Sequence, residues 1–145
     1  MDSWRMDLYS DADFAGTMSQ HSTSGCHLVL TAPSSRFPIL SFSKKQTYVA
    51  TSMAEAELRA LMYAIKSILV PAADLWKSVL GRELAFHVFE DNRSVLYIVS
   101  TGRNRTMRHF ERMHRVSVAW LNQVYAECKF VRWFYATSAE MHTGY

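Results

Sequence analysis

The 145-residue sequence predicts a single α/β domain, in which a mixed five-stranded sheet is flanked by helices. Short apolar runs rich in valine, isoleucine and phenylalanine, each bounded by glycine, proline or serine, have the composition of strands. From residue 53 onward, apolar residues recur instead at helical spacing. Three leading strands followed by alternating helices and strands are typical of a mixed sheet covered by helices.

The first three strands are expected before residue 45. Residues 6–10 alternate weakly and run into residues 11–16, a turn-like segment that ends in glycine. The other two runs follow Gly25 and Pro38, both of which interrupt regular structure. The three strands predicted in this part of the chain are residues 6–10, 26–30 and 39–42.

An amphipathic helix is expected over residues 53–69, because its apolar residues recur every three or four positions. Ser52, followed three residues later by Glu55, matches a capping box and places the start of this helix. Pro71 is expected to end or kink it, and residues 72–80 read as a second helical segment closed by glycine.

The last part of the chain is predicted to add two strands and two helices. A strand over residues 86–89 is followed by a short helix over residues 93–99, which stops near Gly102. A longer helix is expected over residues 107–126, and residues 129–135 form the final strand.

Composition and charge restrict the function classes only loosely. The net charge of +3 and the pI near 9.0 suit a polyanionic partner, although so small an excess is common in other proteins. No apolar run approaches the ~18 residues of a membrane span, and the N-terminus has no apolar signal segment. Cys26 and Cys128 lie outside any CxxC motif and are interpreted as free thiols in an intracellular protein, with a single disulfide as the alternative.

Three carboxylates occupy positions at which a site could form. Asp11 ends the first predicted strand and Asp91 the fourth, and strand ends in an open α/β sheet converge on one crevice. Glu57 lies at the border of the apolar stripe of the long helix, whereas Glu55 is assigned to capping after Ser52. Carboxylates gathered in one place repel one another unless hard cations such as Mg²⁺ bind between them.

Each acid also has a purely local explanation. Asp11 or Asp13 could shape the turn that follows them, because aspartate favours turns. Asp91 or Asn92 could cap the next helix, and Glu57 could be a solvated residue paired with a basic side chain. Spacing alone leaves both interpretations open for each residue.

At these residues the sequence resembles the ribonuclease H domain of copia-type LTR retrotransposons. The resemblance extends from about Leu8 to Tyr135, with the motifs in matching order. The segment around residue 105 is the loosest match, because it carries one extra residue. The motifs that carry the resemblance are Y-S-D-A-D-F-A-G at 9–16, S-T-S-G at 22–25, F-S-K-K-Q at 42–46, V-A-T-S-M-A-E-A-E at 49–57, D-N at 91–92, and R-T with H-F-E at 105–111.

The resemblance implies a ribonuclease H-like fold and an endonuclease that hydrolyses the RNA strand of RNA–DNA hybrids during reverse transcription. It implies two divalent ions, Mg²⁺ or Mn²⁺, with Asp11 as the first metal ligand, Glu57 as the helix ligand and Asp91 as the third acid. The partners it implies are the hybrid and a reverse transcriptase domain of the same polyprotein, in a cytoplasmic virus-like particle or the nucleus.

The C-terminus departs from the family pattern, in which a fourth acid lies in an A-D-x-x-T-K segment. Residues 139–144 match that segment only in part, with Glu140 in place of the aspartate. Either Glu140 is the fourth ligand or the chain stops before the true motif, and we favour a C-terminally truncated domain. The alternatives to an active nuclease are a degenerate remnant that only binds nucleic acid and a structural remnant that does not.

Basic residues are densest between residues 103 and 115. They are interpreted as a phosphate-contacting surface, with a solvated helix face as the alternative. Lys44 and Lys45 are a weaker instance of the same pattern, and Asn92 belongs to the D-N motif. The predicted nucleic-acid-binding residues are Lys44, Lys45, Asn92, Arg103, Arg105 and Arg108.

Overall fold

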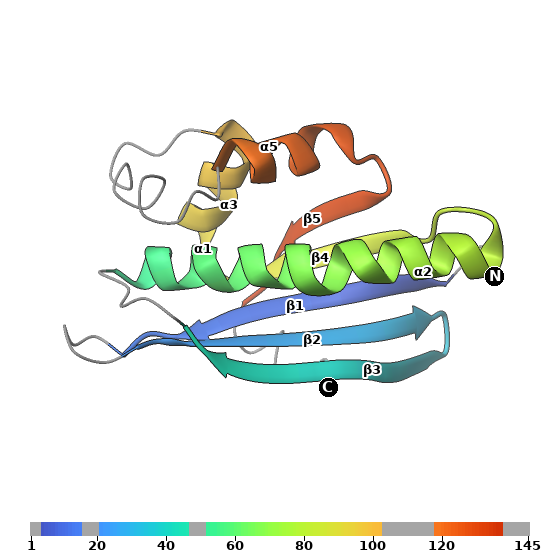
Figure 1. Cartoon of the computed structure of the whole chain (residues 1–145), viewed down its shortest axis with the longest axis horizontal. Helices are drawn as coiled ribbons and strands as arrows, with labels where there is room; N and C mark the ends of the chain where they lie inside the picture. Colours follow the sequence, from blue (N-terminus) through green and yellow to red (C-terminus); the bar gives the residue numbers. More distant parts are fainter. Residues whose placement is uncertain (1–3, 16–20, 47–51, 103–117, 138–145) are drawn as a thin grey trace.

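The computed structural model describes residues 4–15, 21–46, 52–102 and 118–137, which contain one five-stranded sheet of order β3-β2-β1-β4-β5 (Figure 1). β1, β2 and β3 pair antiparallel, whereas β4 is parallel to both β1 and β5. The predicted mixed sheet is therefore confirmed. The strands are β1 (Arg5–Asp13), β2 (Thr23–Ala32), β3 (Ser35–Lys45), β4 (Ala85–Glu90) and β5 (Val131–Tyr135).

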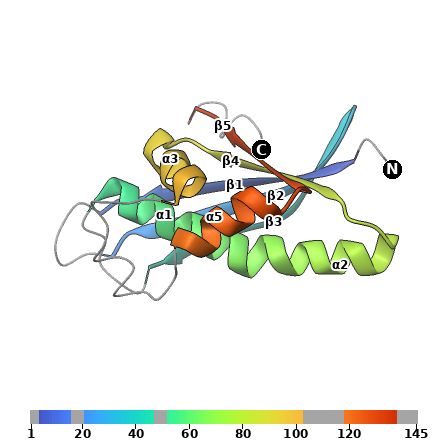
Figure 2. The same cartoon turned by 90° about the horizontal axis from the view of Figure 1, so that it is seen from above.

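The described helices are arranged as one long rod and a shorter pair. The rod runs along the sheet, and α3 and α5 lie side by side next to its first half (Figures 1 and 2). The helical elements are α1 (Met53–Ala64), the π-helical turn η1 (Ile65–Leu69), α2 (Val70–Leu80), α3 (Arg93–Thr101) and α5 (Val118–Glu127). Only the end of the helix predicted over residues 107–126 falls within the described residues.

The second helical segment predicted with Pro71 near its start is present as α2, but Pro71 does not end the helical rod, which runs without a break from α1 through η1 into α2. In an α-helix the proline ring would clash with the carbonyl group of the residue four positions earlier. Here the helix widens to a π-turn just before the proline, and the Val70 N–H group bonds to the carbonyl of Ile65. The wider turn makes room for the ring, so the helix continues from α1 into α2.

The strands extend beyond their predicted limits at Pro38 and at Asp11. Pro38 lies inside β3, because an edge strand has one side on which the missing N–H group is not needed. The register between β2 and β3 shifts at Leu28 and Val29, opposite the proline. β1 likewise continues to Asp13, so Asp11 lies within the last residues of the strand rather than in a turn.

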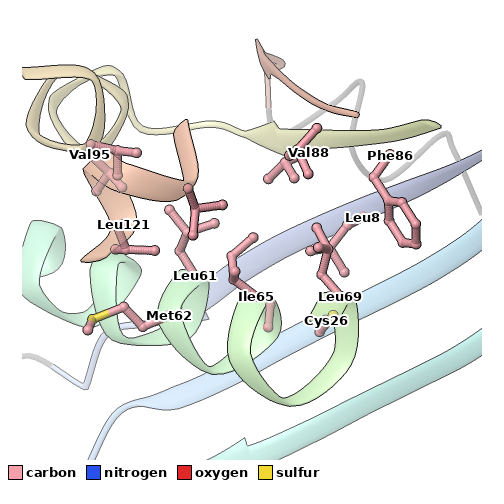
Figure 3. Close-up of a cluster of buried hydrophobic side chains, with 14 of the residues drawn as sticks. Leu8, Cys26, Leu61, Met62, Ile65, Leu69, Phe86, Val88, Val95 and Leu121 are labelled. Carbon is pink, nitrogen blue, oxygen red and sulfur yellow. The ribbon is translucent and has the colours of Figure 1, made fainter. Parts of the chain in front are cut away.

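The hydrophobic core lies between one face of the sheet and the helices (Figure 3). Alternation along each strand sends Leu8, Phe86 and Val88 to this face, where Leu61 and Ile65 of the long helix pack on them. Trp76, Trp120 and Trp133 are partly buried and pack against the same cluster. This packing fixes the long helix across β1 and β2, with side chains of β4 in the same cluster.

Several local predictions about helix ends and cysteines are confirmed. The Ser52 hydroxyl accepts a hydrogen bond from the Glu55 backbone N–H at 3.1 Å and caps α1. Gly102 ends α3 with a left-handed backbone at φ 69°. Cys26 and Cys128 are free thiols, and burial raises the pKa of Cys26 to about 12. None of the helices within the described residues is long and apolar enough to cross a membrane.

Candidate metal centre

The structure brings Asp11, Glu57 and Asp91 together at one edge of the sheet. β1 and β4 are parallel neighbours in which Tyr9 pairs with Phe89. Asp11 and Asp91 each follow two residues later, so they lie level with each other at the ends of the two strands. Glu57 comes from the second turn of α1, which crosses this edge. One carboxylate oxygen from each residue lies within 4.8 Å of the other two. The cluster expected from the strand-end rule is therefore present.

The edge of the sheet is tied to the start of α1 by Gln46, the last residue of the F-S-K-K-Q motif. Its side-chain amide donates hydrogen bonds to the backbone carbonyl of Ala56 at 2.9 Å and to the hydroxyl of Ser24 at 3.0 Å. Its backbone N–H donates to the carbonyl of Ser22 at 2.8 Å. These bonds hold the residue before Glu57 against the ends of β2 and β3.

Glu57 is buried, with 4% of its surface exposed, and this burial changes its acidity. Burial, and then the negative charges of Asp91 and Asp11, raise the pKa of Glu57 to about 8. One of its oxygens, Oε2, has no hydrogen-bond partner within the described part of the chain. The interpretation of Glu57 as a solvated residue paired with a basic side chain is therefore wrong.

Glu55 shows how the same helix neutralises an acid that is not part of the cluster. Its carboxylate receives a hydrogen bond from Arg59 at 2.7 Å, one helical turn later, in a nearly buried ion pair. Glu57, only two residues further on, has no such ion pair among the described residues. From the sequence, Glu55 was assigned to capping and Glu57 was treated as a site candidate, and this difference agrees with that assignment.

A fourth acid, Glu90, lies beneath the cluster and was missed from sequence. It is fully buried, and its Oε1 accepts a hydrogen bond from the Asn92 backbone N–H at 3.3 Å. Burial, followed by the charges of Glu57 and Asp91, raises the pKa of Glu90 well above its ordinary value. The sequence pattern could have revealed the burial of Glu90, because this residue continues the alternation of buried residues, Phe86 and Val88, along β4.

The cluster fits a hard divalent cation better than any other ligand. All of its donors are carboxylate oxygens, which Mg²⁺ and Mn²⁺ prefer. The Oε2 atoms of Glu57 and Glu90 are both buried without a hydrogen-bond partner among the described residues. A cation at the cluster would compensate the repulsion between the three acids and would favour the ionised form of Glu57.

The predicted nucleic-acid residues are only partly described. Lys44 and Lys45 are exposed at the end of β3, and strand pairing through Ser24 brings Lys44 to the same edge as Asp11. The Asn92 side chain accepts hydrogen bonds from two backbone N–H groups and caps α3, so the local interpretation of this residue holds. The predicted residues outside the described part are Arg103, Arg105, Arg108 and Glu140.

Comparison with known proteins identifies the fold. No family model and no curated protein matches the sequence. LC11-RNase H1, isolated from compost, superposes with a TM-score of 0.63 at 12% identity, over 99% of this chain and 91% of that chain. The same enzyme in complex with RNA/DNA hybrid gives a TM-score of 0.58 at 12% identity, over 96% of this chain and 90% of that one.

Two further structures have the same architecture. The N-terminal RNase H domain of a Mycobacterium tuberculosis protein, solved as a fusion with maltose-binding protein, gives a TM-score of 0.63 at 12% identity, over 97% of this chain and 88% of that chain. The prototype foamy virus protease–reverse transcriptase gives 0.53 at 13% identity, over 99% of this chain but 20% of that chain. The chain therefore has a ribonuclease H-like fold.

Proposed function

We propose that this protein is a metal-dependent ribonuclease H, an endonuclease that hydrolyses the RNA strand of RNA–DNA hybrids. The observation that carries the proposal is the convergence of Asp11, Glu57 and Asp91 within 4.8 Å, at the carboxyl edge of a ribonuclease H-like sheet. The fold alone would support many activities, because function depends on the site rather than on the architecture. The complex of LC11-RNase H1 with RNA/DNA hybrid supports the choice of substrate.

In this proposal the three acids hold two divalent ions, Mg²⁺ or Mn²⁺. Such ions, when bound, supply an activated water and stabilise the charge on the leaving oxygen at phosphorus. Glu57 contributes a carboxylate whose ionisation depends on a cation, because its pKa without one is about 8. The Asn92 cap and the Glu90 contact with the Asn92 N–H fix the turn that presents Asp91. The expected products carry a 5′-phosphate and a 3′-hydroxyl.

The resemblance implies a further metal ligand near the C-terminus, and Glu140 is the candidate for that role in this sequence. A Glu140→Gln variant tests it, because loss of a metal ligand should raise the Mg²⁺ concentration needed for cleavage. Cleavage with an unchanged Mg²⁺ dependence would show that Glu140 is not a ligand.

The proposed context is the Pol polyprotein of a copia-type retrotransposon, in which a reverse transcriptase domain is the covalent partner. The motifs between Leu8 and Tyr135, which occur in the same order as in that family, support this origin. The foamy virus structure supports the arrangement, because the matching region is 20% of a chain that also carries protease and reverse transcriptase. We place the activity in a cytoplasmic virus-like particle or in the nucleus.

A second candidate is a degenerate domain that binds nucleic acid without cutting it. The altered C-terminal segment around Glu140 favours it, since the fourth family acid is replaced there. The clustering of Asp11, Glu57 and Asp91 favours the active nuclease.

The deciding experiment is cleavage of an end-labelled RNA–DNA hybrid by the wild-type chain and by Asp91→Asn. Asp74→Asn is the matched control, because Asp74 is exposed on α2, outside the acid cluster. An active nuclease should cut only the RNA strand, lose activity in EDTA and in Asp91→Asn, and keep it in Asp74→Asn. Salt-sensitive binding without cleavage would instead indicate the degenerate domain. Cleavage by Asp91→Asn would show that the proposed metal centre is not the active site.

A further inference from the structure

Two basic side chains at the edge of the sheet are each held over a tyrosine ring. The Lys44 ammonium lies 5.0 Å from the centre of the Tyr63 ring, and the Arg93 guanidinium lies 4.4 Å from the centre of the Tyr135 ring. Both distances are within the range of a cation–π interaction. Lys44 was predicted to contact nucleic acid, whereas Arg93 was not.

These two pairs flank the acid cluster on opposite sides. Lys44 lies on β3 and pairs through Ser24 of β2 with Ala12 of β1, next to Asp11. Tyr135 lies on β5, on the other side of β4. Since neighbouring strands are ~4.8 Å apart, β3 and β5 each lie about 10 Å from β1. A basic group is therefore placed on either side of the carboxylates.

The Arg93–Tyr135 pair is built next to the cluster by the register of the last two strands. Tyr135 pairs with Glu90, and the Ala136 N–H group bonds to the Glu90 carbonyl at 3.0 Å. Arg93 begins α3, two residues after Asp91. Both partners of the cation–π pair are exposed, so the charged face of the guanidinium is accessible to a ligand.

The chemistry of Arg93 fits a phosphate better than a structural role. The ion pairs among the described residues do not include Arg93, so no carboxylate there fixes its guanidinium within ion-pair distance. Stacking on an aromatic ring restricts the side chain while leaving its N–H donors free at the edge. A planar guanidinium held in this way can donate two parallel hydrogen bonds to a phosphate.

A polyanion that approaches this edge needs such compensation. Asp11 and Asp91 place negative charge there, Glu57 and Glu90 add to it when they ionise, and a nucleic-acid backbone would be repelled unless cations lie beside it. We infer that Arg93, oriented by Tyr135, binds a backbone phosphate of the nucleic acid on the β5 side of the acid cluster, opposite Lys44. This inference rests on the proposed function, because it names a further contact with the same substrate.

The test is the affinity for a labelled RNA–DNA hybrid, measured by fluorescence anisotropy without divalent metal over a range of KCl concentrations. The variants are Arg93→Ala, Tyr135→Leu and Tyr135→Phe. Arg82→Ala is the matched control, because Arg82 is an exposed arginine that precedes β4, whereas Arg93 follows it. Thermal unfolding followed by circular dichroism shows whether each variant is folded.

Arg93→Ala should bind roughly tenfold more weakly, and the slope of log affinity against log salt should fall by about 1, as for one lost phosphate contact. Tyr135→Leu should show part of this loss and Tyr135→Phe, which keeps the ring, almost none. Equal affinities and slopes for Arg93→Ala and Arg82→Ala would overturn the inference while leaving the proposed function intact. Failure of the wild-type chain to bind hybrid would overturn the inference, and failure to cleave it with Mg²⁺ as well would overturn the proposed function.

Discussion

Replacing Glu57 by glutamine should stabilise the metal-free protein at alkaline pH. The folded carboxyl group has a pKa of about 8, against an ordinary value of 4.5. The folded state therefore holds a proton that the unfolded state has released, and stability falls as the pH rises between these two values. Glutamine has no such proton to lose, so its folded state should not be weakened over this range.

The size of the effect follows from the pKa difference. Each pKa unit corresponds to ~1.4 kcal/mol, so the shift of Glu57 from 4.5 to about 8 sets an upper limit of roughly 5 kcal/mol. Part of that shift comes from Asp91 and Asp11, and salt weakens their repulsion. We therefore expect Glu57→Gln to be more stable than wild type by about 2–3 kcal/mol near pH 8, and by almost nothing below the ordinary pKa.

The assay is urea unfolding of both proteins between about pH 5 and pH 8, first in EDTA and then with Mg²⁺. Mg²⁺ at a hundred times its Kd should stabilise the wild-type chain by about 2.7 kcal/mol and leave Glu57→Gln nearly unchanged. Glu83→Gln is the control, because Glu83 is exposed in a long ion pair with Lys77 at 3.9 Å. Parallel pH profiles for wild type and Glu57→Gln would refute this account of the buried acid.

Three further predictions concern other parts of the chain. Glu90→Gln should also raise the midpoint of urea unfolding at alkaline pH without metal, because burial raises the pKa of this acid as well. Gly102→Ala should lower stability by about 1–2 kcal/mol in thermal unfolding, since φ is 69° and an added Cβ would lie 3.1 Å from a neighbouring side chain. Arg105→Ala with Arg108→Ala should weaken hybrid binding and flatten its salt dependence; an unchanged slope would contradict the predicted phosphate surface.

The positions of the three acids could be predicted because they depend on a general rule of α/β sheets. Asp11 and Asp91 follow apolar runs that had to be strands, and parallel neighbouring strands end at the same edge. Glu57 could be separated from Glu55 because a helix start follows local capping rules. These steps bring the acids to one edge of the sheet, whereas their assignment as metal ligands came from the family resemblance.

The features that escaped prediction depend on contacts between distant segments or on unusual backbone. The register that pairs Tyr135 with Glu90, and so places Arg93 over a ring, is not encoded in either local pattern. The π-turn before Pro71 is a rare backbone arrangement that apolar periodicity does not predict, and it makes room for the proline ring. Glu90 is different, since its burial followed from strand alternation alone.

The contrast between Glu55 and Glu57 bears on whether the centre binds metal. The chain neutralises Glu55 with Arg59, yet two residues later it buries Glu57 beside three other acids without an ion pair from the described residues. Such an arrangement destabilises the metal-free fold as the pH rises, and a divalent cation is the ligand that would remove that penalty. The response of stability to Mg²⁺ therefore reports on the proposed centre even in a chain that does not cut its substrate.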